Sequence, residues 1–390
     1  MEEFKEEFEQ RLEEEYQNIE REIDRPNILL IGATGVGKSS LVNLIFDKDI
    51  AKTGVGEPVT DGLNKYEDPE VPVTLYDTAG YEIGTKKQEK FLSGVVDYAI
   101  DNQKSVKNKI HLVWYCIDAS GHRVEDIDKD VINELYKSNI PTAVVFTKCD
   151  LVTKGEIEEL EEEISNNLPN IPMFKATVID DNQLEVELNH LDVNKLIDWS
   201  IESLPAGVRA GFIKAQKRNL EVKRKEAKKI ILQHTSGSGL VGFSPIPFSD
   251  APILLSNQAG MFARILSVYD MKYMLKDLKT IVGGLKLPKL ISNAGVWLVG
   301  QFSKFVPGAG QVVGGMISAS VAASITSAIG FTVSEICYRI SKAAIEGKED
   351  KVEKIINNLK PMMKDLFQEH YEKEEKRISE EMEEDDGNGR

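Results

Sequence analysis

Residues 32–39 are Gly-Ala-Thr-Gly-Val-Gly-Lys-Ser, a glycine-rich stretch that decides the fold of the first half of the chain. The apolar run Asn27–Ile31 precedes it and predicts a buried strand, and the pattern of Ser39–Phe46 predicts a helix. A strand, a glycine-rich turn and a helix in this order are typical of the phosphate-binding loop with the pattern G-x-x-x-x-G-K-[ST]. We therefore expect the chain to bind a nucleotide.

The residue types in this loop suit the chemistry of a phosphate. Gly32 and Gly37 allow successive backbone N–H groups to point at phosphate oxygens, and the N-terminus of the helix adds partial positive charge. Lys38 is expected to bridge the β- and γ-phosphates, and the hydroxyl of Ser39 is expected to ligate Mg²⁺, which prefers oxygen ligands. The loop residues predicted to contact the nucleotide are Gly32, Thr34, Gly35, Val36, Gly37, Lys38, Ser39 and Ser40.

Two further motifs predict the metal site and the loops around the γ-phosphate. The stretch Asp-Thr-Ala-Gly begins at Asp77, directly after an apolar strand, so Asp77 is expected to hold Mg²⁺ and the Gly80 N–H to contact the γ-phosphate. Thr60 lies in a polar loop before the next strand and is expected to ligate Mg²⁺ when the γ-phosphate closes that loop. Thr53 is the competing candidate for this role.

A fourth motif predicts the base. Thr147 ends an apolar strand, and Lys148 and Asp150 follow it. The carboxylate of Asp150 can accept hydrogen bonds from guanine N1–H and the exocyclic amine, whereas adenine has no matching pair of donors. The stem of Lys148 can pack on the face of the base. Further along, the N–H of Ala176 is expected to meet the guanine O6.

Taken together, these motifs resemble the small-GTPase superfamily, and most closely its Era-like branch. The resemblance covers about residues 25–204. It implies an α/β domain with a six-stranded, mostly parallel sheet and helices on both faces. It also implies that the protein cycles between GTP and GDP with Mg²⁺ as cofactor and hydrolyses GTP slowly.

Two positions depart from relatives in this superfamily. Tyr81 follows Gly80, where Ras-type proteins carry the glutamine that orients the attacking water, so positioning of the water must come from elsewhere. Gly35 stands where potassium-stimulated relatives carry asparagine, which argues against that mechanism. We therefore expect a slow enzyme that assembly accelerates. Arg123 is a candidate arginine finger in cis or across a dimer, and an exposed loop arginine is the alternative interpretation.

Composition indicates an ordinary folded protein that is acidic overall. The chain has 390 residues, 41% hydrophobic and 29% charged, with a net charge of −16 that argues against general nucleic-acid binding. The spacing of its three cysteines suits neither a disulfide framework nor a zinc site, and the acidic N-terminus suits no targeting peptide. We expect a cytoplasmic location, with contact at or insertion into the cytoplasmic face of a membrane as a further option. The expected domains are an N-terminal amphipathic helix (1–24), a GTPase domain (25–204), a helical domain (205–368) and a charged tail (369–390).

The remainder of the chain predicts an all-α domain that includes the N-terminal helix, which is expected to dock on the chain's own helices or on a partner. Basic residues crowd one predicted helix over 209–229, followed by a break at Thr235–Gly239. This helix pairs with the acidic N-terminal helix in one interpretation, and contacts anionic lipid or, with less support, RNA in the other. In residues 291–334 the only charged side chain is Lys304, so this segment forms either a buried hairpin or a membrane span.

This arrangement looks like that of bacterial Era-like GTPases with a C-terminal hydrophobic helical domain, on the residues Pro245–Pro247, Asp250–Pro252 and Gln258–Met261. It is also similar, more distantly, to the interferon-inducible immunity GTPases, which implies a nucleotide-dependent homodimer and membrane contact. We expect a GTP-dependent switch that acts on the helical domain. The alternatives are a dynamin-like membrane-remodelling GTPase, a ribosome- or RNA-associated GTPase, and a nucleotide sensor with almost no hydrolysis.

Overall fold

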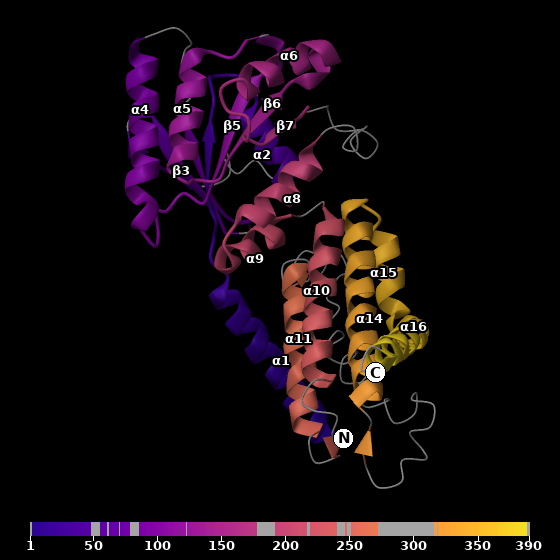
Figure 1. Ribbon diagram of the computed structural model, residues 1–390. Coiled ribbons are helices and arrows are strands. Elements are labelled where there is room, and N and C mark those ends of the chain that lie inside the picture. Colours follow the sequence, from indigo (N-terminus) through magenta and orange to yellow (C-terminus); the bar gives the residue numbers. More distant parts are fainter. Residues whose placement is uncertain are drawn as a thin grey trace. The chain divides into compact units, whose positions relative to one another are not determined.

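The computed structural model divides the chain into two compact units (Figure 1). The sheet unit is Ile23–Arg218, and the helical unit combines Met1–Glu22 with Asn219–Arg390. In the sequence, the sheet unit is thus inserted between the first helix and the remaining helices of the helical unit. The structure describes residues 2–47, 55–60, 62–69, 71–78, 86–121, 123–177, 192–216, 219–239, 246–247, 251–271, 316–317 and 319–387.

One seven-stranded sheet organises the sheet unit, in the order β2-β3-β4-β1-β5-β6-β7. Five strands are parallel, and β2 and β3 form an antiparallel edge. The predicted α/β fold is confirmed, with one strand more than the six expected, because residues on the N-terminal side of Thr60 pair with β3 instead of forming a loop. The strands are β1 (Asn27–Ile31), β2 (Val55–Thr60), β3 (Leu63–Asp68), β4 (Val71–Thr78), β5 (Leu112–Asp118), β6 (Thr142–Thr147) and β7 (Met173–Lys175).

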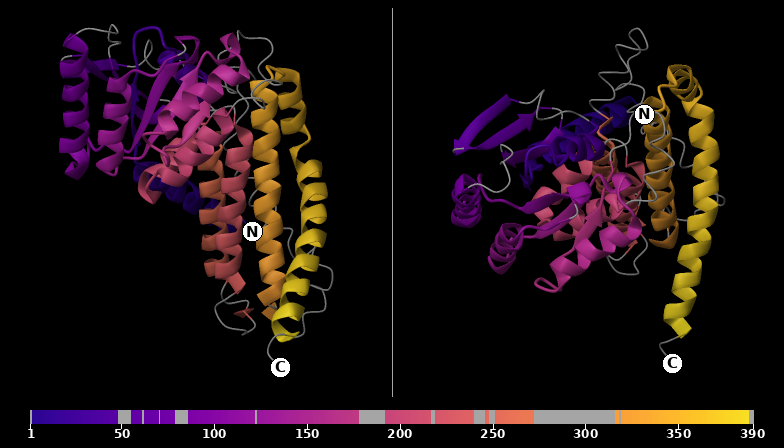
Figure 2. Two further views of the ribbon diagram at one scale, coloured as in Figure 1. Left: turned by 45° about the horizontal axis from the view of Figure 1, so that its top comes forward. Right: turned by 90° about the horizontal axis from the view of Figure 1, so that it is seen from above.

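Helices cover this sheet and account for its apolar strands. Every residue of β1 and β6 is buried, as expected for central parallel strands with helices on both faces. Two of the helices, α4 and α5, lie side by side (Figure 2). The helical segments are α2 (Lys38–Phe46), α4 (Lys86–Asp101), η1 (Asn102–Lys104), η2 (Ala119–Gly121), α5 (Asp126–Lys137), η3 (Cys149–Leu151), α6 (Lys154–Ser165), α8 (Val193–Ser203) and α9 (Ala206–Ala215).

An aromatic cluster of Phe46, Trp114 and Phe212 packs α9 into the sheet unit. Phe46 is the last residue of α2, and its ring meets Phe212 of α9 edge to face at 5.8 Å between centroids. Trp114 of β5 contacts both rings and donates its indole N–H to Ser200 Oγ at 3.2 Å. All three aromatic side chains are buried. The helix that begins at the phosphate-binding loop therefore ends against α9.

The helical unit has one core to which both ends of the chain contribute. Leu12 and Tyr16 of α1 lie in the same buried cluster as residues of α10, α11, α14 and α16. As expected, α1 packs on the chain's own helices: it lies against α11, where Ser267 Oγ donates to Glu20 Oε1 at 2.8 Å. The elements are α1 (Glu2–Glu22), α10 (Leu220–Gly239), β8 (Ile246–Pro247), α11 (Ala251–Val268), β9 (Met316–Ile317), α14 (Ala319–Ile345), α15 (Glu349–Asn357) and α16 (Leu359–Gly387).

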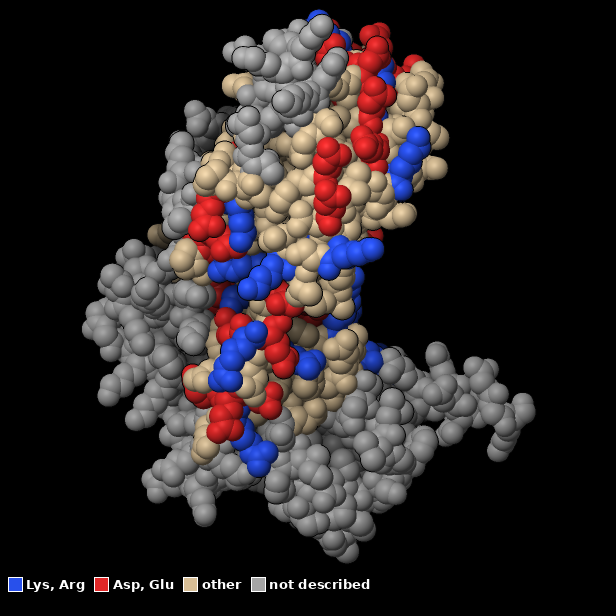
Figure 3. All heavy atoms as spheres, turned by 90° about the vertical axis from the view of Figure 1, so that its left-hand side faces the viewer, with Lys and Arg blue, Asp and Glu red and all other residues tan. Residues whose placement is uncertain are grey.

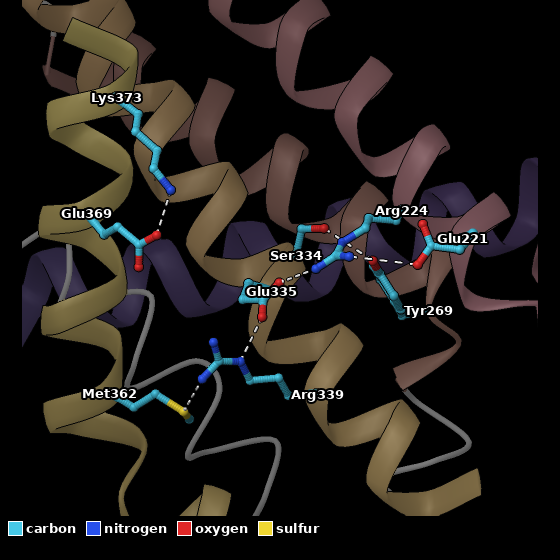
Figure 4. A network of polar contacts seen from close by, with 9 residues as sticks. All are labelled: Glu221, Arg224, Tyr269, Ser334, Glu335, Arg339, Met362, Glu369 and Lys373. Carbon is cyan, nitrogen blue, oxygen red and sulfur yellow. Dashed lines mark hydrogen bonds and ion pairs between the residues drawn. The ribbon is translucent and has the colours of Figure 1, made fainter. Parts of the chain in front are cut away.

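An ion-pair network joins α10 to α14 (Figure 4). Arg224 donates to Glu335 at 2.6 Å, and its guanidinium lies 4.1 Å from the centre of the Tyr338 ring. Arg339 donates to the second oxygen of Glu335 at 2.7 Å. Burial alone would raise the pKa of Glu335, but the hydrogen bonds from the two arginines hold that pKa below its ordinary value of 4.5. Arg224 of this basic helix therefore pairs with α14, whereas one of the two interpretations of the sequence paired the helix with the acidic N-terminal helix.

Several predicted boundaries differ from the structure. The expected boundary at 204/205 lies at 218/219, because α9 packs in the sheet unit through Phe212. The single basic helix over 209–229 is two helices, and α10 continues to Gly239 without a break at Thr235, whose hydroxyl donates to Ile231 O within the helix. The expected tail from 369 begins as part of α16, since Tyr371 and Glu374 are buried.

The apolar segment 291–334 is described only in its last part. Residues 291–315 lie outside the described residues, and α14 covers 319–334. In this part Ile325, Ile329 and Val333 join the helical core, and hydroxyl side chains are buried among them. Within the described parts of the chain, the structure contains no helix with the length and apolarity that crossing a membrane requires.

Candidate nucleotide-binding site

The glycine-rich loop between β1 and α2 needs its glycines for two different reasons. A Cβ atom on Gly32 would lie 2.6 Å from the backbone oxygen of Cys116, so no side chain fits there. Gly35 and Gly37 have φ values of 77° and 100°, which side chains rarely tolerate. Gly37 directly precedes α2 and has no side chain to cap it, which leaves the first N–H groups of α2 available to an anion.

Lys38 places a positive charge inside this loop. Its side chain is buried, and Nζ donates to the carbonyl oxygens of Gly32 at 2.7 Å and Ala33 at 3.3 Å. The loop thus curls around the ammonium group and holds it beside the backbone that precedes α2. This is the placement that a point charge for the β- and γ-phosphates requires.

Asp77 lies on β4, opposite Leu30 of β1, close to where the loop begins. Burial raises its pKa to about 6, against the opposing effect of the Lys38 charge. Its Oδ1 atom is buried and has no hydrogen-bond partner among the described residues. A buried carboxylate oxygen without a donor fits a hard cation, so Asp77 and the Ser39 hydroxyl in the first turn of α2 are the residues that would hold Mg²⁺. When bound, this ion neutralises phosphate charge.

The predicted loop residues around the γ-phosphate are described only in part. The backbone of Thr60 ends β2, where it lies opposite Leu63, but its side chain is outside the described set. Thr53, Gly80 and Tyr81 also lie outside the described residues. The roles of Thr60 and Gly80 therefore stay predictions.

Thr147 connects the base end of the site to the phosphate loop. Its hydroxyl is buried and donates to Val36 O in the loop, with Ile117 O as a second acceptor at 3.2 Å. The space beside Gly37 is filled by the same side chain. The sequence motif predicted that Thr147 contacts the nucleotide. The structure shows that Thr147 also holds the phosphate-binding loop, through a contact between residues 111 positions apart.

Lys148 follows in a left-handed backbone conformation, with φ at 55°, and its side chain turns toward β5. There Nζ donates to Asp118 Oδ2 at 2.5 Å. The second oxygen of Asp118 accepts from the N–H and the hydroxyl of Ser120. Burial alone would raise the pKa of Asp118, but the hydrogen bonds from Lys148 and Ser120 bring that pKa below its ordinary value.

Asp150 is exposed, and Thr177 orients it by donating its hydroxyl to Oδ1. The expectation for Ala176 is wrong in this structure, because its N–H donates to Phe146 O at 2.7 Å. Thr177 itself was not predicted. Only the order of residues after a three-residue strand could have indicated it, and that strand is too short to give a periodic signal.

Arg123 lies just before α5 and away from these contacts. Its Nε pairs with Glu125 at 2.8 Å, and 66% of its side chain is exposed. Glu125 and Asp128 form a reciprocal cap at the start of α5, and Asp128 also accepts from the buried Tyr115 hydroxyl at 2.6 Å. The base of the Arg123 loop is therefore rigidly held, while the arginine extends from it.

Comparisons with known proteins agree with this geometry. A family model described as 50S ribosome-binding GTPase matches residues 27–148. The "Probable GTP-binding protein EngB" of Leuconostoc citreum is 35% identical over 147 residues, which cover 37% of this chain and 73% of that protein. The "GTPase Der" of Deinococcus deserti is 31% identical over 159 residues, or 40% of this chain and 34% of that protein. A crystal structure of a probable engB protein covers 45% of this chain and 97% of its own, with 16% identity and a TM-score of 0.32.

The described site brings together a lysine in a glycine-rich loop, a buried carboxylate beside it and an exposed carboxylate at the base end. It can hold the phosphates, a cation and a guanine base in one row along the ends of β1, β4 and β6. With this geometry and with an EngB relative that is 35% identical and matched over 73% of its length, the chain belongs to the P-loop GTPases of the EngB type, which bind GTP and GDP with Mg²⁺ and hydrolyse GTP.

Proposed function

We propose that this GTPase is a molecular switch whose nucleotide state controls the helical unit through α9. The contact between Phe46 and Phe212 carries the proposal. Phe46 ends the helix that begins with Lys38, and Phe212 lies on the last helix before the chain enters the helical unit. A shift of α2 on exchange of GDP for GTP would therefore press on α9, because packed aromatic rings transmit displacement instead of absorbing it.

The second covalent link between the units supports the same route. The chain leaves the helical unit after Glu22 and enters β1 through residues 23–26. Gly211 of α9 lies directly against this link, since a Cβ atom there would be 2.6 Å from Asp24 O and 3.3 Å from Pro26 Cδ. A displacement of α9 would therefore act on both links at once.

The first helix after the link, α10, is the expected recipient. Its contact with α14 rests in part on the pair of Arg224 and Glu335, whose side chains are 43% and 19% exposed. Partly exposed ion pairs contribute modestly to stability and can exchange partners, so this contact suits a helix that moves between two positions.

Hydrogen–deuterium exchange tests this route. Peptides from α10 are expected to exchange differently with GDP and with a non-hydrolysable GTP analogue. Phe212→Leu should abolish the difference while nucleotide binding is retained. Phe174→Leu is the matched control, because Phe174 is also a buried aromatic residue but its ring contacts Trp199 instead of α2. Equal exchange of α10 in both nucleotide states of the wild type would contradict the proposal.

For hydrolysis, the candidate stimulating residue is Arg123. Tyr81 cannot orient water as a glutamine does, so slow turnover and acceleration by assembly are proposed together. The exposed side chain of Arg123 could reach a second copy in a nucleotide-dependent homodimer. Arg123→Ala should then lower the turnover that rises with protein concentration and leave the turnover at low concentration unchanged. If Arg123→Ala keeps the full concentration-dependent turnover, Arg123 has no role in the mechanism.

The class of partner has two candidates. The family description favours a ribosomal or RNA partner, and the resemblance of the helical half favours an anionic membrane surface at the cytoplasmic face. Either would meet Lys225, Lys228 and Lys229, which are exposed on α10. Three basic residues of the expected basic helix, Arg209, Lys214 and Lys223, are half-buried or buried and do not add to that surface. Figure 3 shows Lys and Arg side chains (blue) next to Asp and Glu side chains (red), so the charge on the described part of that face is mixed.

Two binding assays on the same protein distinguish these partners. Flotation with vesicles of phosphatidylglycerol and phosphatidylcholine measures membrane contact, and co-sedimentation with 50S subunits measures ribosome contact, each with GDP and with a GTP analogue. The variant with Lys225, Lys228 and Lys229 changed to Gln should lose binding in the assay in which the wild type binds. Salt should weaken RNA binding steeply.

A further inference from the structure

We propose that Asp118 is a positioning residue for base recognition, acting through Lys148. The inference rests on the proposed contact between Lys148 and the base. Asp118 belongs to none of the motifs that identify the nucleotide site, and it precedes Lys148 by 30 residues. Its place in the sheet brings the two together.

The geometry of the sheet sets the distance between these residues. Asp118 is the last residue of β5, and it lies opposite Thr147, the last residue of β6. Lys148 comes next in the chain and leaves the strand in a left-handed conformation. This turn directs its side chain back toward β5, where Nζ meets Asp118 Oδ2 at 2.5 Å. The pairing is thus built into two adjacent parallel strands.

The carboxylate of Asp118 is itself held in place on both oxygens. Oδ1 accepts from Ser120 N at 3.0 Å and from Ser120 Oγ at 2.6 Å, so the carboxylate cannot rotate without losing two hydrogen bonds. A carboxylate fixed in this way presents Oδ2 to Lys148 in one orientation. Ser120 belongs to η2, the start of the segment that leads to Arg123, so the same carboxylate also anchors that segment.

A lysine side chain has four rotatable bonds and loses considerable conformational entropy when a ligand orders it. Asp118 restricts that freedom before the nucleotide arrives, and pre-ordering of this kind increases affinity. The pair is partly exposed, with side-chain exposures of 37% for Lys148 and 25% for Asp118, so its effect is moderate. We expect Asp118→Asn to weaken GDP binding about two- to fivefold, the range given by a partly exposed ion pair.

A double-mutant cycle tests whether Asp118 acts through Lys148. The affinity for fluorescent GDP is measured for the wild type, Asp118→Asn, Lys148→Ala and the double variant. We expect Asp118→Asn to weaken binding in the wild type and to have no further effect when Lys148 is already Ala. Asp118→Glu, which keeps the charge, should recover part of the affinity. Asp126→Asn is the matched control, because Asp126 also pairs with a lysine but is 97% exposed.

The outcomes separate this inference from the proposed site. Unchanged affinity of Asp118→Asn, or effects of the two single variants that multiply fully in the double variant, would overturn the role of Asp118. Unchanged affinity of Lys148→Ala would instead overturn the placement of the base. Thermal unfolding of each variant identifies a folding defect, and Asp118→Ser, which retains a small polar side chain, provides the same cycle if the Asn variant does not fold.

Discussion

Most of the largest fully buried side chains lie in the sheet unit, whereas α14 of the helical unit buries a row of small hydroxyl side chains. Trp114, Tyr76 and Phe146 are among the largest fully buried side chains, and all lie in the sheet unit. In the helical unit, α14 buries Ser327 and Thr332 at an exposure of 0%. Small residues let helices approach closely, and hydroxyls then bond either their own helix or a neighbouring one. The helical unit therefore depends on close helix packing and on hydroxyl contacts in addition to its apolar core.

The largest expected effect concerns the function of the sheet unit alone. Lys38→Ala removes the charge that faces the phosphates and should weaken GDP binding about 100-fold, or about 3 kcal/mol. Titration with fluorescent GDP measures it. The free energy of unfolding of the helical unit should not change. Lys154→Ala is the control, because Lys154 is 91% exposed on α6, and equal binding by both variants would contradict the assignment.

A substitution at Gly330 breaks the packing of the helical unit instead. A Cβ atom at this position would lie 2.6 Å from Ile231 Cγ1 and 3.0 Å from Met261 Sδ. Gly330→Val should therefore destabilise the helical unit by about 1–3 kcal/mol through overpacking, while GDP binding is retained. Urea unfolding followed by circular dichroism measures this. Gly94→Val on α4 is the control, since no atom lies within 4 Å of its Cβ position.

One hydroxyl of α14 bonds a neighbouring helix and another bonds its own helix, so substitutions can compare the two kinds of contact. Ser327 donates to Glu374 at 2.6 Å, and Glu374 is only 9% exposed. Ser327→Ala should destabilise the helical unit by about 1–2 kcal/mol, because a buried carboxylate loses a donor. Thr332→Val should have a smaller effect, since that hydroxyl bonds Ala328 O within its own helix. A larger effect for Thr332→Val in urea unfolding would show that the interhelical bond is unimportant.

The smallest effect is expected at the network between α10 and α14. Arg224→Ala should destabilise the helical unit by about 0.5–1 kcal/mol at neutral pH, as partly exposed ion pairs do. The pKa of Glu335 is lower in the folded protein, so this ion pair stabilises the fold above the ordinary pKa of 4.5 and is lost as pH falls through the lowered value. The difference between variant and wild type should therefore shrink in acid. Lys229→Ala is the control and should destabilise the unit less at neutral pH, because its pair with Glu226 lies within one helix.

The sheet unit could be predicted from the sequence to the extent that its signals are local. Strands β1 and β6 are continuous apolar runs, and the loop between β1 and α2 carries its glycines at fixed spacing, so both could be located. Asp118 and Thr177 could not, because their roles arise from contacts with residues 30 and 27 positions away. The Ala176 prediction failed because β7 is only three residues long, and a register error there moves every N–H.

For the helical unit, the sequence predicted helices but not how they pack against one another. A run of basic residues over 209–229 indicated one solvated helix, yet Lys214 and Lys223 are buried and the run is divided between the two units. Charge patterns assume that long basic side chains stay in water, and packing of their stems overrides that assumption. The partner of Arg224 on α14 lies 111 residues away, beyond any local signal.

The contribution of α1 to the helical core has a consequence for biosynthesis. Leu12 and Tyr16 leave the ribosome before the sheet unit, but the helix that buries them, α11, begins at Ala251. The sheet unit is complete before that point, and domains generally fold as units during synthesis. The nascent chain therefore carries an unburied amphipathic helix ahead of a GTPase domain that can already fold. We expect chaperones that recognise exposed apolar helices to bind α1 until α11 and the later helices emerge.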